Sequence, residues 1–172
     1  MKPTIFFTTL IVMAALAAPF KSFAVDRGRQ AEVAQRGAEV MPFSLKATTH
    51  IFTKSDDGGS QQVIAKNPAD SVQIRLIRAH LRRIQTQFQR GDFSGPARIH
   101  GTDMPGLAQL RAAKSGQILI TYEDIKGGGK LTYRSDDTKL VSSLHAWFDA
   151  QISDHGADAT DGHMHHQGMT QP

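Results

Sequence analysis

Two stretches of this chain carry the same succession of patterns, and this repetition limits the possible folds more than any other feature. The first stretch covers residues 43–89 and the second covers residues 117–152. In each stretch, two short segments rich in β-branched and aromatic residues flank a turn, which contains Asp57-Gly58-Gly59 in the first and Gly127-Gly128-Gly129 in the second. The sequence therefore predicts an α+β fold: two strand–turn–strand–helix units forming a four-stranded antiparallel sheet with two helices on one face.

The two predicted helices follow the hairpins and carry apolar stripes. Asn67 or Asp70 can cap the first helix, and Asp136 and Asp137 are the predicted caps of the second. Apolar residues recur every three or four positions in both, as one buried face of a helix requires. The stripes consist of Ile74, Ile77, Leu81, Ile84 and Phe88 in the first helix and Val141, Leu144, Phe148 and Ile152 in the second.

The remainder of the chain divides into four segments. Residues 1–24 have a basic start, an apolar run and small residues before a cleavage position, which predicts a secretory signal peptide. Residues 25–42 are a polar lead-in that forms a short helix or stays mobile. A single domain is predicted over residues 43–153, and residues 154–172 are predicted to be a disordered tail rich in His and Met.

A long link joins the two predicted units between residues 92 and 116. Pro105 to Ala113 could form a short helix within it, and Phe93, Ile99 and Leu107 suggest that the link folds back onto the domain. Irregular links of this length are uncommon inside compact domains unless they have a function.

Composition excludes several classes of function. The chain has no cysteine, so thiolate catalysis, iron–sulfur clusters and cysteine zinc sites are impossible. The predicted signal peptide holds two of the 20 basic residues and none of the 16 acidic ones, so the exported chain has a net charge of +2. A basic row on the first helix (Arg75, Arg78, Arg82, Arg83) is typical of a solvent-exposed face, and export removes most nucleic-acid partners. We therefore expect no nucleic-acid partner, and no membrane span after signal cleavage.

Histidine is the unusual residue of this sequence, with eight copies. Neutral imidazole suits copper, zinc and nickel, and thioether sulfur favours Cu(I). The tail combines both kinds of donor and is a candidate low-specificity site for copper or zinc, through His163, Met164, His165, His166 and Met169. The alternative is that any histidine-rich tail binds metal in vitro without that being its purpose.

Four further histidines lie in the predicted domain. His100 and Met104 are spaced as a pair of donors in the link, while His50 lies in a strand and His80 and His145 lie on the two helices. Three imidazoles that converged would form a metal site with an open position. The alternative is that each is an ordinary hydrogen-bonded histidine at the edge of the core and that Met104 fills a gap in it.

No established catalytic motif is present. The chain lacks a Gly-x-Ser-x-Gly elbow, a phosphate-binding loop, a His-Glu-x-x-His pair and a dinucleotide fingerprint. An enzyme using His80 or His100 as general base is the weakest hypothesis, because no nucleophile or orienting partner is recognisable.

Residues 43–155 resemble a group of small exported bacterial proteins of uncharacterised function. The resemblance rests on short segments spread along the chain: Ala47-Thr48-Thr49-His50-Ile51-Phe52, Ile77-Arg78-Ala79-His80-Leu81, Gly91-Asp92-Phe93-Ser94, Ile99-His100 and Asp154-His155. Similar chains are sometimes labelled aspartate carbamoyltransferase. The residues do not support that activity, because the Ser-Thr-Arg-Thr-Arg phosphate motif of that enzyme family is absent and the chain is too short for its two domains. The resemblance raises interest in His50, His80 and His100.

Taken together, these features predict a periplasmic or secreted protein that binds a transition metal, with copper preferred, in metal handling or tolerance. The alternative from a different class is a non-enzymatic module that binds a small ligand or a protein and in which the histidines are structural.

Overall fold

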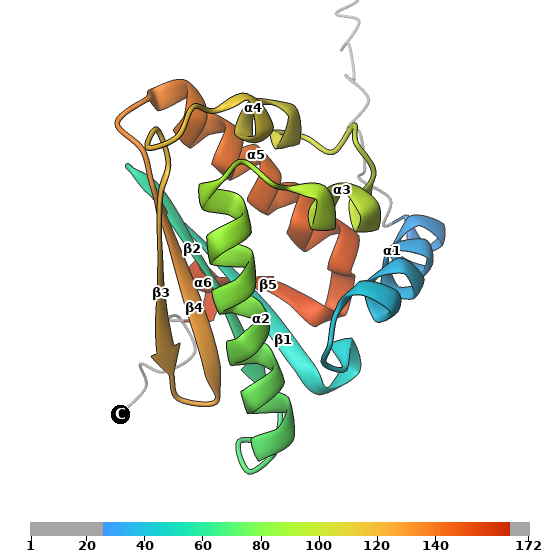
Figure 1. Ribbon diagram of the computed structural model, residues 1–172. Coiled ribbons are helices and arrows are strands. Elements are labelled where there is room, and N and C mark those ends of the chain that lie inside the picture. Colours follow the sequence, from blue (N-terminus) through green and yellow to red (C-terminus); the bar gives the residue numbers. More distant parts are fainter. Residues whose placement is uncertain (1–25, 166–172) are drawn as a thin grey trace, which may run out of the picture.

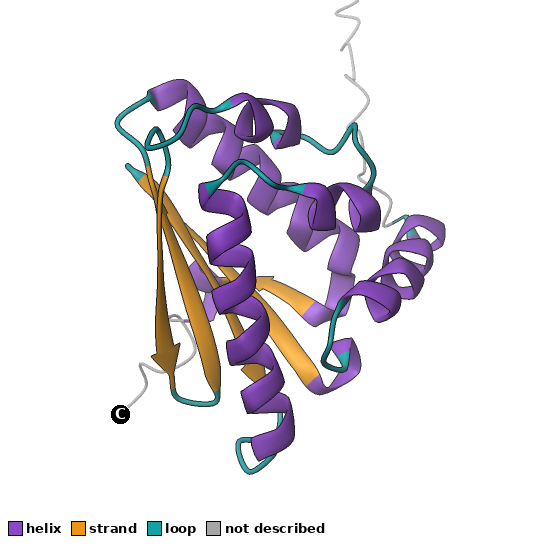
Figure 2. Cartoon of the chain, viewed as in Figure 1, coloured by secondary structure: helices purple, strands orange, loops and turns teal. Residues whose placement is uncertain are grey.

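A five-stranded mixed sheet forms one layer of the protein, and helices form the other (Figures 1 and 2). The computed structural model describes residues 26–165, with side chains over residues 26–163. The strand order is β3-β4-β2-β1-β5. The strands are β1 (Thr48–Ser55), β2 (Gly58–Ala65), β3 (Leu119–Ile125), β4 (Gly128–Arg134) and β5 (Ala159–Asp161).

The two hairpins predicted from the sequence are confirmed. β1 pairs antiparallel with β2, and β3 pairs antiparallel with β4. The hairpins join through an antiparallel β2–β4 pair. Gly58 has φ +146° and lies so close to β4 that a Cβ would sit 2.1 Å from the carbonyl oxygen of Tyr133. Only glycine fits this position, since the backbone of one hairpin touches that of the other there.

Both long helices pack on one face of the sheet, as the sequence predicts. They are α2 (Ser71–Gln89), capped by Asp70, and α5 (Thr138–His155), capped by Asp137. Phe148 of α5 contacts Phe52 of β1 and Tyr133 of β4, with ring centroids 5.3 and 5.7 Å apart. Leu81 of α2 lies over Gly129 of β4 on that same face. The core is therefore the layer between the sheet and these helices.

The fifth strand corrects the prediction of four antiparallel strands. β5 pairs with β1 in parallel, with Ala159 opposite His50 and Asp161 opposite Phe52. A three-residue strand is too short to show the alternating pattern from which strands are recognised. Its pairing depends on α5 returning the chain to the edge of β1, which is a tertiary event.

Ordered structure also continues past residue 153, where the tail was expected to begin. The helix α5 runs to His155, a 3₁₀ turn covers Gly156–Asp158, and α6 (Gly162–His165) follows β5. Lys66 binds Asp158 at 2.9 Å. This segment has few apolar side chains to bury; backbone pairing with β1 and polar contacts hold it instead.

Three shorter helices cover the end of the helix layer. The polar lead-in forms α1 (Arg27–Val40), which is capped by Asp26, packs on α3 and α5, and buries Val33 and Gly37. The link contains α3 (Ser94–His100) and α4 (Leu107–Ala112), and α4 confirms the short helix predicted there. The link folds back as expected, because Phe93, Ile99 and Leu107 are buried; a 3₁₀ turn over Leu45–Ala47 precedes β1. None of the helices within residues 26–165 has both the length and the apolar composition needed to cross a bilayer.

Candidate functional site

Four histidines from four separate elements line one cavity between the sheet and the helices. They are His50 of β1, His80 of α2, His100 at the end of α3 and His155 at the end of α5. The volume of this cavity is about 40 Å³, whereas one water molecule requires roughly 10–15 Å³. The cavity can therefore hold a small ligand or a few waters.

Local patterns explain why these side chains point inward. His50 shares the inward-facing positions of β1 with Thr48 and Phe52, because strand side chains alternate between faces. His80 lies beside Ile77 and Leu81 on the buried stripe of α2. His155 falls seven residues after Phe148, two helical turns along the same side of α5.

His155 lies between His50 and His100. Its ring is nearly parallel to that of His50 (5°) and nearly perpendicular to that of His100 (79°), with a centroid separation of 5.0 Å in each case. Two imidazoles bound to one ion through Zn–N bonds of about 2.0–2.1 Å have centroids roughly 5 Å apart. As the rings stand, however, no three His, Asp or Glu side chains among the described residues form a group able to hold a metal ion. Ion binding would therefore require the rings to turn about their side-chain bonds.

The orientation of His100 is set by a buried carboxylate. Nδ1 of His100 lies 2.8 Å from Oδ2 of Asp154, and both side chains are almost completely buried. Arg29 of α1 binds the same carboxylate through Nε and Nη2, at 2.5 and 2.7 Å, and also donates to the carbonyl oxygen of His100. Burial raises the pKa of Asp154, but the hydrogen bonds from Arg29 and His100 outweigh burial and leave the pKa below its ordinary value of 3.8.

This contact assigns the proton on His100. An ionised carboxylate only accepts hydrogen bonds, so Nδ1 of His100 carries the proton and Nε2 keeps its lone pair. Metal-binding histidines are commonly held this way, with the second ring nitrogen donating to a carboxylate. Asp154 thus orients the ring of His100. Nε2 of His100 is then available as a metal ligand or as a general base.

His80 carries its proton on the other ring nitrogen, Nε2. Nη2 of Arg83 lies 2.9 Å from Nδ1 of His80. Because a guanidinium only donates, Nδ1 of His80 is the acceptor and Nε2 carries the proton. The ring of Phe43 packs against that of His80 edge-on, at 5.5 Å. His80 is therefore equipped to donate a hydrogen bond.

All four imidazoles are kept neutral. Burial lowers the pKa of His80 and of His155 from 6.5 to about 4, and burial together with the neighbouring His155 holds the pKa of His50 well below 6.5. Burial also lowers the pKa of His100, although Asp154 opposes the shift. Neutral imidazole is the form that binds metal ions.

Two polar atoms of the lining residues lack partners. Nδ1 of His50 and Nε1 of Trp147 are buried and make no hydrogen bond within the described part of the chain. Buried polar groups normally have a hydrogen-bond partner, either a protein group or an ordered water molecule. Both residues line the cavity, so a molecule placed there could supply the missing partners.

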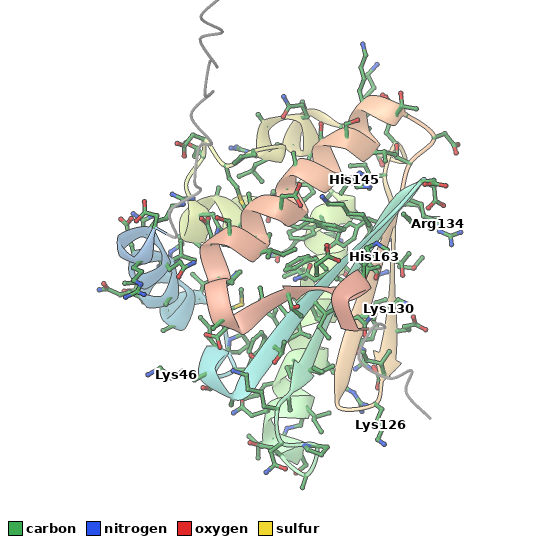
Figure 3. The ribbon with its side chains drawn as sticks, turned by 180° about the vertical axis from the view of Figure 1, so that it is seen from behind. Lys46, Lys126, Lys130, Arg134, His145 and His163 are labelled. Carbon is green, nitrogen blue, oxygen red and sulfur yellow. The ribbon has the colours of Figure 1, made fainter. Side chains whose placement is uncertain are left out.

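The other predicted donors lie elsewhere. Nε2 of His145 contacts the carbonyl oxygens of Ser55 and Gly58, and Nε2 of His163 contacts that of Lys54, so both rings lie near the β1–β2 turn (Figure 3). Met104 is buried in the hydrophobic core and does not line the cavity. The side chains of Met164 and His165, and residues His166 and Met169, lie outside the described residues.

Sequence reasoning missed Asp154 and His155, which it placed at the start of the tail. A signal was available: Leu140, Leu144, Trp147, Gln151 and Asp154 follow one another at steps of four and three, and all are buried on α5. The polar members of this stripe obscured its continuation to the helix end.

Comparison of the chain with protein-family models, curated proteins and solved structures finds no match in any of the three.

Proposed function

We propose that this is an exported protein that binds one transition-metal ion, with copper preferred over zinc, in the cavity between His50, His100 and His155. The observation that carries the proposal is that four imidazoles from four separate elements line one cavity. A core histidine with a purely structural role needs no other histidine near it.

Two further features support the proposal. The Arg29–Asp154–His100 chain presents Nε2 of His100 with a free lone pair. In addition, three of the cavity histidines come from segments that carry the resemblance to small exported proteins, around His50, His80 and His100, and the fourth comes from Asp154-His155. We retain the tail donors as a separate, weaker capture site for the same ions.

We predict that the exported chain retains one copper or zinc ion in the cavity. The measurement is equilibrium dialysis at micromolar free metal, on full-length protein in which the tail donors are removed by His163→Ala, Met164→Leu, His165→Ala, His166→Ala and Met169→Leu. His50→Gln and His100→Gln in this background should weaken metal binding at least 100-fold, because each removes one of three ligands.

His145→Gln is the matched control, since this histidine contacts backbone carbonyls outside the cavity. It should leave the metal isotherm unchanged. Loss of stability in the His50 and His100 variants, without any bound metal in the parent protein, would contradict the proposal.

That contrary result would favour the second candidate, a module that binds a small organic ligand. The cavity lining is largely apolar, with Val63, Leu81, Ile84, Phe88 and Ile99 among its residues. Pockets of this kind, with a few polar groups that orient the ligand, are typical small-molecule sites.

A further inference from the structure

The charge around the cavity differs from that of an ordinary divalent-metal site. No Asp, Glu, Lys or Arg among the described residues lines it, and an imidazole that binds a metal ion does so in its neutral form. Asp154 approaches from behind His100, but Arg29 binds both of its oxygens. Asp158 is bound by Lys66. A divalent ion held by three imidazoles would therefore keep both of its charges uncompensated in an apolar space.

Such a charge is costly to bury. The free energy of moving an ion out of water is large and is recovered only by nearby opposite charge or by strong polar contacts. Three imidazoles also leave an open coordination position. An anion from solution can fill that position and reduce the net charge of the metal centre. A further neutral ligand could fill the position but would leave the net charge unchanged.

Two donors of the lining are suited to hold that anion. Nε2 of His80 carries a proton, because Arg83 occupies Nδ1. The indole Nε1–H of Trp147 is buried without a partner, and it can only donate. Neither group is needed as a ligand to the metal.

We infer that a divalent ion in this cavity binds together with one small anion, which fills the open position and accepts hydrogen bonds from His80 and Trp147. The inference rests on the proposed function and defines the exchangeable ligand of that site as anionic. Monovalent copper, with half the charge, would bind without the anion.

The test uses the full-length, tail-substituted protein defined above, loaded with Cu(II) in buffer free of coordinating anions, with azide as the probe. Azide should produce a saturable charge-transfer absorption with one azide per copper. His80→Phe should retain copper and weaken azide binding roughly 10- to 100-fold, because it removes a hydrogen bond to a charged group. Trp147→Phe should do the same, and its folding is checked by near-ultraviolet circular dichroism because Trp147 packs in the core.

The outcomes are distinguishable. Copper retained without any azide-dependent absorption overturns the anion inference and leaves the proposed function standing. Azide affinity unchanged in both folded variants also overturns it, since the donors would then be wrong. Absence of bound copper overturns both proposals.

Discussion

Asp154→Asn should weaken metal binding in the cavity by roughly 10- to 100-fold, the range found when the partner behind a ligating histidine is lost. The carboxylate holds the Nδ1 proton of His100 at 2.8 Å and is itself held by Arg29. An asparagine of the same shape removes the negative charge, so it holds neither His100 nor Arg29 as strongly. The dialysis measurement described above gives the change in affinity.

The same substitution should lower the free energy of unfolding by about 1–3 kcal/mol, measured by denaturant titration of the metal-free protein. The figure is below that for a fully buried ion pair because the side chain of Arg29 is 38% exposed and gains water when the charge is lost.

Asp158→Asn is the matched control for this prediction. Its partner Lys66 is 44% exposed, and the pair lies at the surface four residues further along the chain. A surface pair of this kind contributes about 0–1 kcal/mol. Equal losses of stability and affinity in the two variants would show that Asp154 has no special part in holding the site.

Metal-free protein should lose stability steeply as the pH falls from 6.5 towards 4. In the unfolded chain histidines titrate near 6.5, whereas burial lowers the pKa of folded His80 and His155 to about 4. Between pH 6.5 and pH 4, these histidines are protonated in the unfolded state and neutral in the folded state. Unfolding therefore becomes more favourable as the pH drops. Above pH 6.5 both states are neutral, and this contribution to stability is fully present.

For His80 alone the loss of stability reaches about 3 kcal/mol at pH 4, because its pKa is 6.5 in the unfolded chain and about 4 in the folded protein. Denaturant titrations at pH 7.5, 6, 5 and 4.5 with a chelator present measure the slope. His80→Phe should make the dependence on pH shallower, because phenylalanine cannot be protonated.

His145→Gln again provides the comparison, as its ring lies outside the cavity. It should leave the slope close to that of the parent. A pH dependence that is the same in His80→Phe and in the parent would contradict the burial of a neutral imidazole at this position.

Several elements could be predicted because their signals are local. The stripe from Ile77 to Phe88 predicts α2, and the cap Asp70 marks its beginning. The glycines beside Asp57 and Lys126 predict both hairpins. These features depend on residues that lie close together in the sequence, so they can be predicted without knowledge of the tertiary structure. Residues after 153 lack such a pattern, and β5 was missed for that reason.

The candidate site was only partly predictable. His50, His80 and His100 could be singled out as unusual side chains, but nothing in their spacing shows which of them share a cavity. His145 occupies a position on α5 that looked equivalent to that of His80 on α2. It does not line the cavity, however, and lies near the β1–β2 turn (Figure 3). The role of Asp154 required knowing that α1, α3 and α5 meet at one point.

The amino-acid order by itself determined the two hairpin-and-helix units, with His50 in a strand and His80 at the edge of a helical apolar stripe, because periodicities of 2.0 and 3.6 residues are properties of the local backbone. Only the folded chain decided that the ends of α3 and α5 bring His100 and His155 to these two residues, and that α1 supplies Arg29 behind them. Those contacts join residues up to 125 positions apart, and such distances are closed by packing of the core rather than by any local rule.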